Sequence, residues 1–319
     1  DDEARGYLES AGVLGLETPV ERLQHMNQPA YEFYLNRNPG IDLAADRLEI
    51  GVCAQHNNGG IDVDLWWRSS IAGLFPVGEA AGAHGVARPG GAALNSAQVG
   101  ATRAAQWIAA REQGAARADE GWQELAGDAL QKARSLLEAA CGREESSGVL
   151  IDDVLMESTR AMSDNAGLVR SRQGLEELAR NVAEWRRRVV DECVVDPTSR
   201  RSVDRLFLVR DILDVQAVYV AAMLDHLDHG VGSRGSVLYT DPDGDLPVSW
   251  WNDGADLDVE EIFRHRLDSK AHHGVTQRVS VDAVGEAIHA HWGPVRPIPT
   301  EDEFLENVWK TYRVDHNIH

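Results

Sequence analysis

Histidine is the residue type with the most obvious capacity for chemistry here, because imidazole binds metals and transfers protons near neutral pH. The chain has 12 histidines. The clustered ones lack carboxylate or cysteine partners at the regular spacing of a metal site. We therefore predict no metal site and expect packed or surface histidines. The clustered histidines are His272, His273, His289, His291, His316 and His319.

Nucleophilic and nucleotide-binding motifs are not complete in this sequence. It has no Gly-x-Ser-x-Gly elbow, no P-loop, and no glycine fingerprint between a strand and a helix. Cys53, Cys141 and Cys193 are far apart and odd in number, so they build neither a disulfide framework nor a Cys-x-x-Cys site. We expect them to be small buried hydrophobic residues in a reducing compartment.

The segment from residue 48 to residue 113 has the pattern of a cofactor site. An apolar run at 48–54 predicts a strand that ends in a polar turn, and a second short strand is predicted at 73–77. The most glycine-dense stretch follows at 78–100, and then a helix of small residues to about Gln113. Strand, glycine-rich turn and helix, in that order, bring the backbone close to a cofactor.

Residues 118–228 have the periodicity of a helical bundle. Apolar residues recur at spacings of three and four, which places them on one helix face. The last helix, about 199–228, is apolar nearly all round at 217–224 and is predicted to be the central, buried helix. The two stripes are Trp122, Leu125, Ala129, Ala133, Leu136 and Ala140, and then Leu175, Leu178, Val182, Trp185 and Val189.

The region from Gly230 to the end reads as a small α+β domain. Strands are predicted at 236–240 and 276–284, and a last helix begins at a capping box from Thr300 to Glu303.

Composition excludes several classes of protein. The net charge is -21 over 319 residues, and a phosphate backbone would be repelled by that field, so nucleic-acid binding is excluded. No apolar run approaches the roughly 18 to 20 residues of a membrane span, so we expect no transmembrane segment. The chain opens at Asp1 without a signal peptide or an initiator Met, and we expect a cytoplasmic fragment of a longer protein.

The ordered motifs of residues 59–100 resemble the flavoprotein subunits of the succinate dehydrogenase and fumarate reductase family, to which L-aspartate oxidase also belongs. The family pattern has a Gly-Gly turn, then GLF…GE, then HG…R.GG, then a helix of small residues. This chain reads GG at 59–60, GLFPVGE at 73–79 and HGVARPGG at 84–91. The segments 156–170 and 229–235 resemble later family motifs, so the resemblance covers most of residues 1–240.

The resemblance implies a set of FAD contacts. Glu79, after Gly78, is expected to accept hydrogen bonds from the ribityl hydroxyls. Gly90 and Gly91 are expected to let the backbone approach the isoalloxazine ring. The start of the following helix, at Ala93 and Leu94, is expected to stabilise the negative charge of the reduced flavin with its N–H groups and dipole.

The resemblance also implies a carboxylate-binding site. Arg88 occupies the position of the family's substrate arginine, close to His84, and its guanidinium can grip a carboxylate through two hydrogen bonds. The histidine that family members carry four residues before the Gly-Gly turn is Gln55 here, and His56 is its neighbour. Ala92 also replaces the usual Asn. Because of these departures, we leave the identity of the carboxylate substrate open.

These observations predict an α+β fold that is predominantly α. The expected domains are the C-terminal part of a capping and FAD-binding domain at 1–115, a helical bundle at 116–229 and a small C-terminal domain at 230–319. The expected function is that of the C-terminal part of an FAD-dependent oxidoreductase that transfers hydride between flavin and a carboxylate substrate. The family places the glycine fingerprint and the proton donor upstream, so we expect the isolated chain to be inactive and to carry no FAD.

A second hypothesis is a non-catalytic role. The acidic helical bundle would then be a docking module for a partner, such as an iron–sulfur or other electron-transfer subunit.

Overall fold

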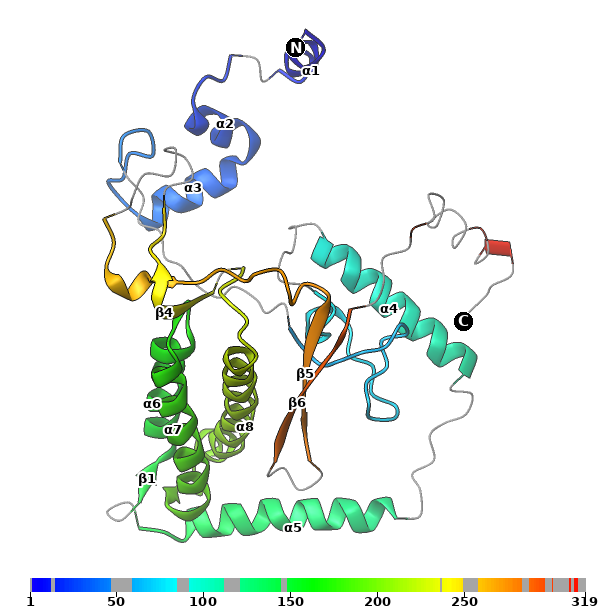
Figure 1. Cartoon of the computed structure of the whole chain (residues 1–319), viewed down its shortest axis with the longest axis vertical. Coiled ribbons are helices and arrows are strands. Elements are labelled where there is room, and N and C mark those ends of the chain that lie inside the picture. The colour runs from blue at the N-terminus through cyan, green and yellow to red at the C-terminus, as the bar shows by residue number, and fades with distance from the viewer. Residues whose placement is uncertain are drawn as a thin grey trace. The chain divides into compact units, whose positions relative to one another are not determined.

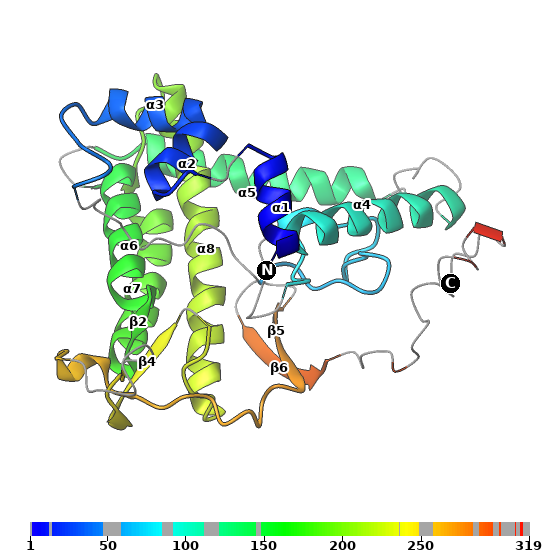
Figure 2. The same cartoon turned by 90° about the horizontal axis from the view of Figure 1, so that it is seen from above.

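The chain divides into two compact units, residues 1–57 and 58–319, which are described separately below. The predicted boundaries at 115/116 and 229/230 stay predictions. The computed structural model describes residues 2–12, 15–46, 59–84, 92–111, 121–144, 148–235, 237–248, 258–282, 287–295, 300, 310 and 313–314 (Figure 1, Figure 2).

The first unit contains three short helices, α1 (Asp2–Ser10), α2 (Pro19–Met26) and α3 (Gln28–Arg37). Helix α2 begins at Pro19, directly after its N-cap residue Thr18. The two ends of a capping box meet there: the Thr18 hydroxyl accepts from the Glu21 N–H, and the Glu21 carboxylate accepts from the Thr18 N–H.

The core of the second unit lies among three helices that pack on one another: α6 (Ile151–Ala166), α7 (Arg172–Asp191) and α8 (Arg200–Asp228) (Figure 2). Each contributes a buried apolar stripe, and α8 contacts both of the others. The predicted stripe of α7 is confirmed, since all five of its residues are buried. Other fully buried side chains are Val154 on α6 and Leu206, Val209, Leu213 and Val220 on α8.

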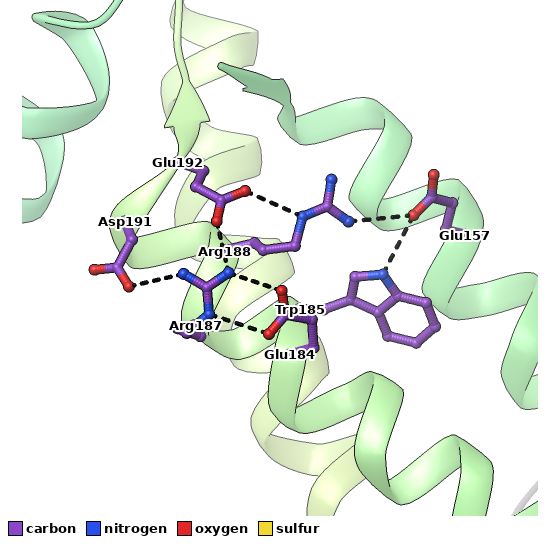
Figure 3. A network of polar contacts seen from close by, with 7 residues as sticks. All are labelled: Glu157, Glu184, Trp185, Arg187, Arg188, Asp191 and Glu192. Carbon is purple, nitrogen blue, oxygen red and sulfur yellow. Dashed lines mark hydrogen bonds and ion pairs between the residues drawn. The ribbon is translucent and has the colours of Figure 1, made fainter. Parts of the chain in front are cut away.

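The exposed face of α7 is held by ion pairs around its C-terminal turns, drawn in Figure 3. Arg187 bonds to Glu184, Asp191 and Glu192. The Trp185 indole Nε1 donates across to Glu157 of α6 at 3.2 Å. Surface pairs of this kind contribute little each, so the apolar stripe remains the main source of helix packing.

Helix α5 (Trp122–Cys141) joins this core only through its last turns. Its predicted stripe is therefore correct at Leu136 and Ala140, whereas Trp122 at the other end is half exposed. A stripe at helical spacing indicates an apolar face, but it does not say how far the neighbouring helix extends along it.

Two short strand pairings, each of two residues per strand, lie at the ends of the helices. β1 (Val149–Leu150) pairs parallel with β3 (Cys193–Val194), and β2 (Val169–Arg170) pairs parallel with β4 (Leu238–Asp245). Cys193, the first residue of β3, is fully buried. Burial raises the pKa of its thiol to about 11, against the opposing effect of the nearby Arg143. The prediction of buried cysteines is confirmed for Cys193, while Cys53 lies outside the described residues.

A hairpin of β5 (Val275–Val281) and β6 (Ile288–Pro294) confirms the strand predicted at 276–284. It packs on α8 through Asp225, whose carboxylate accepts from Gln277 Nε2 at 2.6 Å and from Trp292 Nε1 at 2.7 Å. The short helix η2 (Glu261–Phe263) precedes it. The predicted capping box at 300–303 lies largely outside the described residues. None of the described helices is long and apolar enough to cross a membrane.

The buried stripe of α8 yields a prediction about stability. Replacing Leu213, which is completely buried, with Ala should lower the free energy of unfolding by about 2 to 5 kcal/mol because it leaves a cavity in the core. The matched control is Leu130→Ala, since Leu130 lies on α5 and is 69% exposed. Urea unfolding measures both changes, and an equal loss in the two variants would contradict the assignment of the core.

Candidate functional site

The predicted cofactor segment forms a short turn packed on a long helix. The turn is η1 (Gly78–Ala80), and the helix is α4 (Ala92–Arg111). Gly78 has φ +66°, in the left-handed region that favours glycine, and the position of a Cβ on it lies 4.0 Å from Ala97 Cβ. Any larger side chain at position 78 would be strained, so the sequence Gly-Glu is suited to this turn.

The strand predicted at 73–77 is wrong. Residues 74–77 belong to no strand, and the backbone hydrogen bonds at Leu74 are local ones to Ser69 and Ile71. A strand requires a neighbouring strand to pair with, and apolar composition alone does not supply one. The strand predicted at 48–54 lies outside the described residues.

Backbone contacts fix η1 to the segment that follows the Gly59-Gly60 turn. The Ile61 N–H donates to the Ala80 carbonyl, and the Gly82 N–H donates to the Ile61 carbonyl, both at 2.9 Å. A Cβ on Gly60 would lie 2.5 Å from the Ala80 oxygen. Glycine is required there because the two backbones touch.

A stack of aromatic rings and guanidinium groups attaches the same segment to α4. The Trp66 and Trp107 rings lie 5.6 Å apart. The Arg103 guanidinium lies 4.1 Å from the Trp66 ring, and the Arg68 guanidinium lies 4.1 Å from the Trp107 ring. Arg103 Nε also donates to the Leu65 carbonyl at 2.7 Å. We call these four side chains, Trp66, Arg68, Arg103 and Trp107, the Trp–Arg stack.

Helix α4 also accommodates Trp67, which lies between Trp66 and Arg68 in the chain, because it has a glycine where that ring approaches. Gly100 is buried, and a Cβ on it would lie 2.4 Å from Nε1 of Trp67. Trp67 itself has φ +57°, an uncommon conformation for a bulky residue. Sequence reasoning missed this contact, because nothing in the run Trp66-Trp67-Arg68 points to a glycine 33 residues further along the chain.

A carboxylate holds the turn that carries these tryptophans. Asp64 accepts hydrogen bonds from the N–H groups of Trp66 (2.8 Å) and Arg68 (3.0 Å), and from Arg68 Nε (2.6 Å). Burial alone would raise the pKa of Asp64, but these hydrogen bonds and the Arg68 charge hold that pKa below its usual value. Next to the turn lies a cleft of about 670 Å³, closed on one side by the ion pair of Arg278 with Asp62 at 3.0 Å.

Several of the predicted site residues are among those described. Glu79 is exposed in η1, Ala93 is half-buried and Leu94 is 72% exposed in the first turn of α4. His84 is half-buried, and both its ring nitrogens are buried without a hydrogen-bond partner among the described residues. The predicted residues Gln55, His56, Arg88, Gly90 and Gly91 lie outside the described residues.

Two other kinds of site can be assessed within the described ranges. No group of three or more histidine, cysteine or acidic side chains there is arranged to hold a metal ion. Gly230, Gly232 and Gly235 have the spacing Gly-x-Gly-x-x-Gly, but they follow the end of α8 and precede β4. Because a dinucleotide fingerprint joins a strand to a following helix, these glycines do not form one.

Comparison with known proteins gives a consistent set of relatives. No family model matches the chain. It is 39% identical over 66 residues to one of the subunits of fumarate reductase (CoM/CoB) from Methanothermobacter marburgensis, covering 20% of this chain and 12% of that protein. It is 36% identical over 86 residues to L-aspartate oxidase of Pyrococcus furiosus, covering 26% and 18%.

Solved structures share the fold at low sequence identity. The FrdA protein of Escherichia coli quinol fumarate reductase has a TM-score of 0.66 at 19% identity, covering 90% of this chain and 45% of FrdA. The apo Sdh1 complex of Mycobacterium smegmatis has a TM-score of 0.58 at 19% identity, covering 95% and 47%. This chain therefore spans less than half the length of the solved relatives.

The hydrogen bonds to Asp64 yield a pH prediction. Because its folded pKa is lowered, its stabilising effect is present above the unfolded pKa of about 3.9 and is lost as the pH falls through the folded value. Asp64→Asn should therefore destabilise the chain at pH 6 and make much less difference at pH 3. Unfolding free energies of both proteins at the two pH values measure this, with Asp62→Asn as the control. An equal difference in unfolding free energy between the wild type and Asp64→Asn at pH 6 and at pH 3 would contradict the prediction.

Proposed function

Because this chain is related to the flavoprotein subunits of fumarate reductase and succinate dehydrogenase, we propose that it is the C-terminal part of an FAD-dependent oxidoreductase. Its substrate would be a small molecule that carries a carboxylate. The observation that carries this proposal is the packing of η1 on α4, which brings Glu79 and the first turns of the helix into one region.

The described residues fit a flavin in three respects. Glu79 is an exposed carboxylate that can accept hydroxyl hydrogen bonds. The first turn of α4 has N–H groups without partners inside the helix and the positive end of the dipole. His84 has two buried ring nitrogens without partners among the described residues, and buried polar atoms normally have one. A polar ligand beside His84 would satisfy them.

Each residue then has a distinct role. Bound FAD supplies hydride transfer. Glu79 holds the ribityl hydroxyls, and the N–H groups at Ala93 and Leu94 stabilise negative charge on the ring edge. Arg88 binds and orients the substrate carboxylate with a bidentate contact, assisted by His84 and by His56 or Gln55. The proton donor belongs to a part of the protein that precedes this chain.

The apolar side chains exposed on residues 59–84 and 92–111, within the described part of the chain, support a composite cofactor site. Large apolar side chains are exposed on both the loop and the helix, an unusual number for a surface that faces only water. We infer that an upstream dinucleotide-binding half covers them and holds the pyrophosphate and adenosine. The exposed side chains are Ile61, Leu65, Ile71, Leu74, Val77, Leu94, Val99 and Ile108.

One observation favours the docking function as the second candidate. A groove of about 420 Å³ runs between α6 and α8, with Met162, Ile212 and Val215 among its lining residues and the nearly buried Gln216 beside them. Apolar grooves between helices are common sites for a partner helix. An iron–sulfur or other electron-transfer subunit is the partner that a flavoprotein of this kind would need.

The composite site predicts how flavin binding depends on the upstream half. The chain alone should bind FAD weakly or not at all, whereas the chain produced together with that half should bind about one FAD. Flavin absorbance after gel filtration measures both. Stoichiometric flavin on the isolated chain would refute the composite site, and no flavin on the joined protein would favour the docking function.

The role of Arg88 yields a kinetic prediction. In the joined protein, Arg88→Lys should retain FAD but lower kcat/KM for the carboxylate substrate by one to two orders of magnitude, since Lys cannot reproduce the two parallel hydrogen bonds. Arg134→Lys, at an exposed position on α5, is the control. An unchanged kcat/KM in Arg88→Lys would remove this residue from the substrate site.

A further inference from the structure

We propose that the Trp–Arg stack is a positioning device for the flavin: it sets the direction of the start of α4 relative to Glu79 and thereby the flavin reduction potential. The proposal rests on the proposed function, because it concerns the same cofactor site. Trp66, Arg68, Arg103 and Trp107 are positioning residues, since none of them is among the expected flavin contacts.

The two groups of flavin contacts need such a device because they belong to different segments. Glu79 lies in η1, and the N–H groups lie at the start of α4. Within the described residues, their relative placement depends on where the loop 59–82 packs against the helix. Near the candidate cofactor site, η1 packs on α4 around Gly78, where even an added Cβ would lie 4.0 Å from Ala97 Cβ, so only small groups meet at that point.

The Trp–Arg stack provides a larger and more directional contact further along the helix. Trp66 is 7% exposed, so the Arg103 guanidinium over its face acts on a largely desolvated ring, where cation–π attraction is strongest. The Trp66 ring also contacts the Trp107 ring, at 5.6 Å between centroids. The Arg68 guanidinium in turn lies 4.1 Å from the Trp107 ring. The two rings are tilted by 39° to one another and each has a guanidinium 4.1 Å from its centroid, so a rotation of the helix would have to break these contacts.

The loop transmits this restraint to Glu79. Asp64 fixes the turn that carries Trp66 and Arg68. Shortly before that turn, Ile61 is hydrogen-bonded to Ala80 and Gly82 around the end of η1. A shift of the stack therefore moves η1 through a short path of backbone bonds, and Figure 1 shows the loop and α4 lying along one another.

The effect should appear in the reduced flavin more than in the oxidised flavin. Helix dipole stabilisation acts within the first turn and depends on where the N–H groups point. Reduced flavin carries negative charge at the ring edge, whereas oxidised flavin is neutral there. A tilted α4 would therefore weaken binding of the reduced form selectively, which lowers the midpoint potential.

The experiment uses the joined protein with FAD and two pairs of variants. Gly100→Ala places a methyl group against Trp67, and its control is Gly127→Ala, since a Cβ at Gly127 meets nothing within 4 Å. Arg103→Gln removes the guanidinium 4.1 Å from Trp66, and its control is Arg111→Gln, whose guanidinium lies 5.8 Å from Trp107. Midpoint potential, FAD affinity and circular dichroism are measured for the wild type and the four variants.

We expect Gly100→Ala and Arg103→Gln to bind reduced flavin about tenfold more weakly relative to oxidised flavin, which is about 30 mV for a two-electron couple. Both controls should match the wild type. Unchanged potentials in folded Arg103→Gln would overturn the positioning role while leaving the proposed function intact. A wild-type joined protein without flavin would instead reject the proposed function, and this inference with it. If Gly100→Ala does not fold, Arg103→Gln alone decides.

Discussion

The part of the chain that carries the candidate cofactor site depends on how closely the loop 59–82 can approach itself and α4. The loop 59–82 reaches the helix at Gly100 and at Gly78, and it touches itself at Gly60. A Cβ at Gly60 or Gly100 would lie 2.5 Å or less from its nearest neighbour, a distance that forces one side to move. The tryptophan contacts, the position of η1 and the exposure of Glu79 all follow from these approaches. Glycine here determines packing rather than chain flexibility.

The helical half depends on a different principle. Helices α6, α7 and α8 bury continuous apolar stripes against one another, and the short pairs β1–β3 and β2–β4 join the helix ends. Residues 59–84 and 92–111, in contrast, bury few large side chains and expose many. The described chain thus combines a part with a continuous apolar core and a part that packs mainly through close backbone approaches.

The sequence alone predicted the α7 stripe, one strand of the C-terminal hairpin and the family, because these depend on local periodicity and on motif order. The α7 stripe and the strand at 275–281 are examples. It failed at 73–77, where a strand requires a partner that apolar composition does not reveal. It also missed the contact of Trp67 with Gly100, since 33 residues separate them and no periodic pattern links a tryptophan to a distant glycine. The roles of all the candidate site residues stay predictions, and five of these residues, Gln55, His56, Arg88, Gly90 and Gly91, also lie outside the described residues.

The buried Cys193 is a built-in probe for local opening of the helical core. Burial raises the pKa of this thiol to about 11, so only a minute fraction is thiolate at neutral pH, and the side chain is fully buried in the core. Alkylation of Cys193 therefore requires a local opening of the core. The half-buried Cys141 at the end of α5 offers a second thiol for comparison. The labelling rate of Cys193 relative to Cys141 would report how often the core opens locally, without any engineered probe.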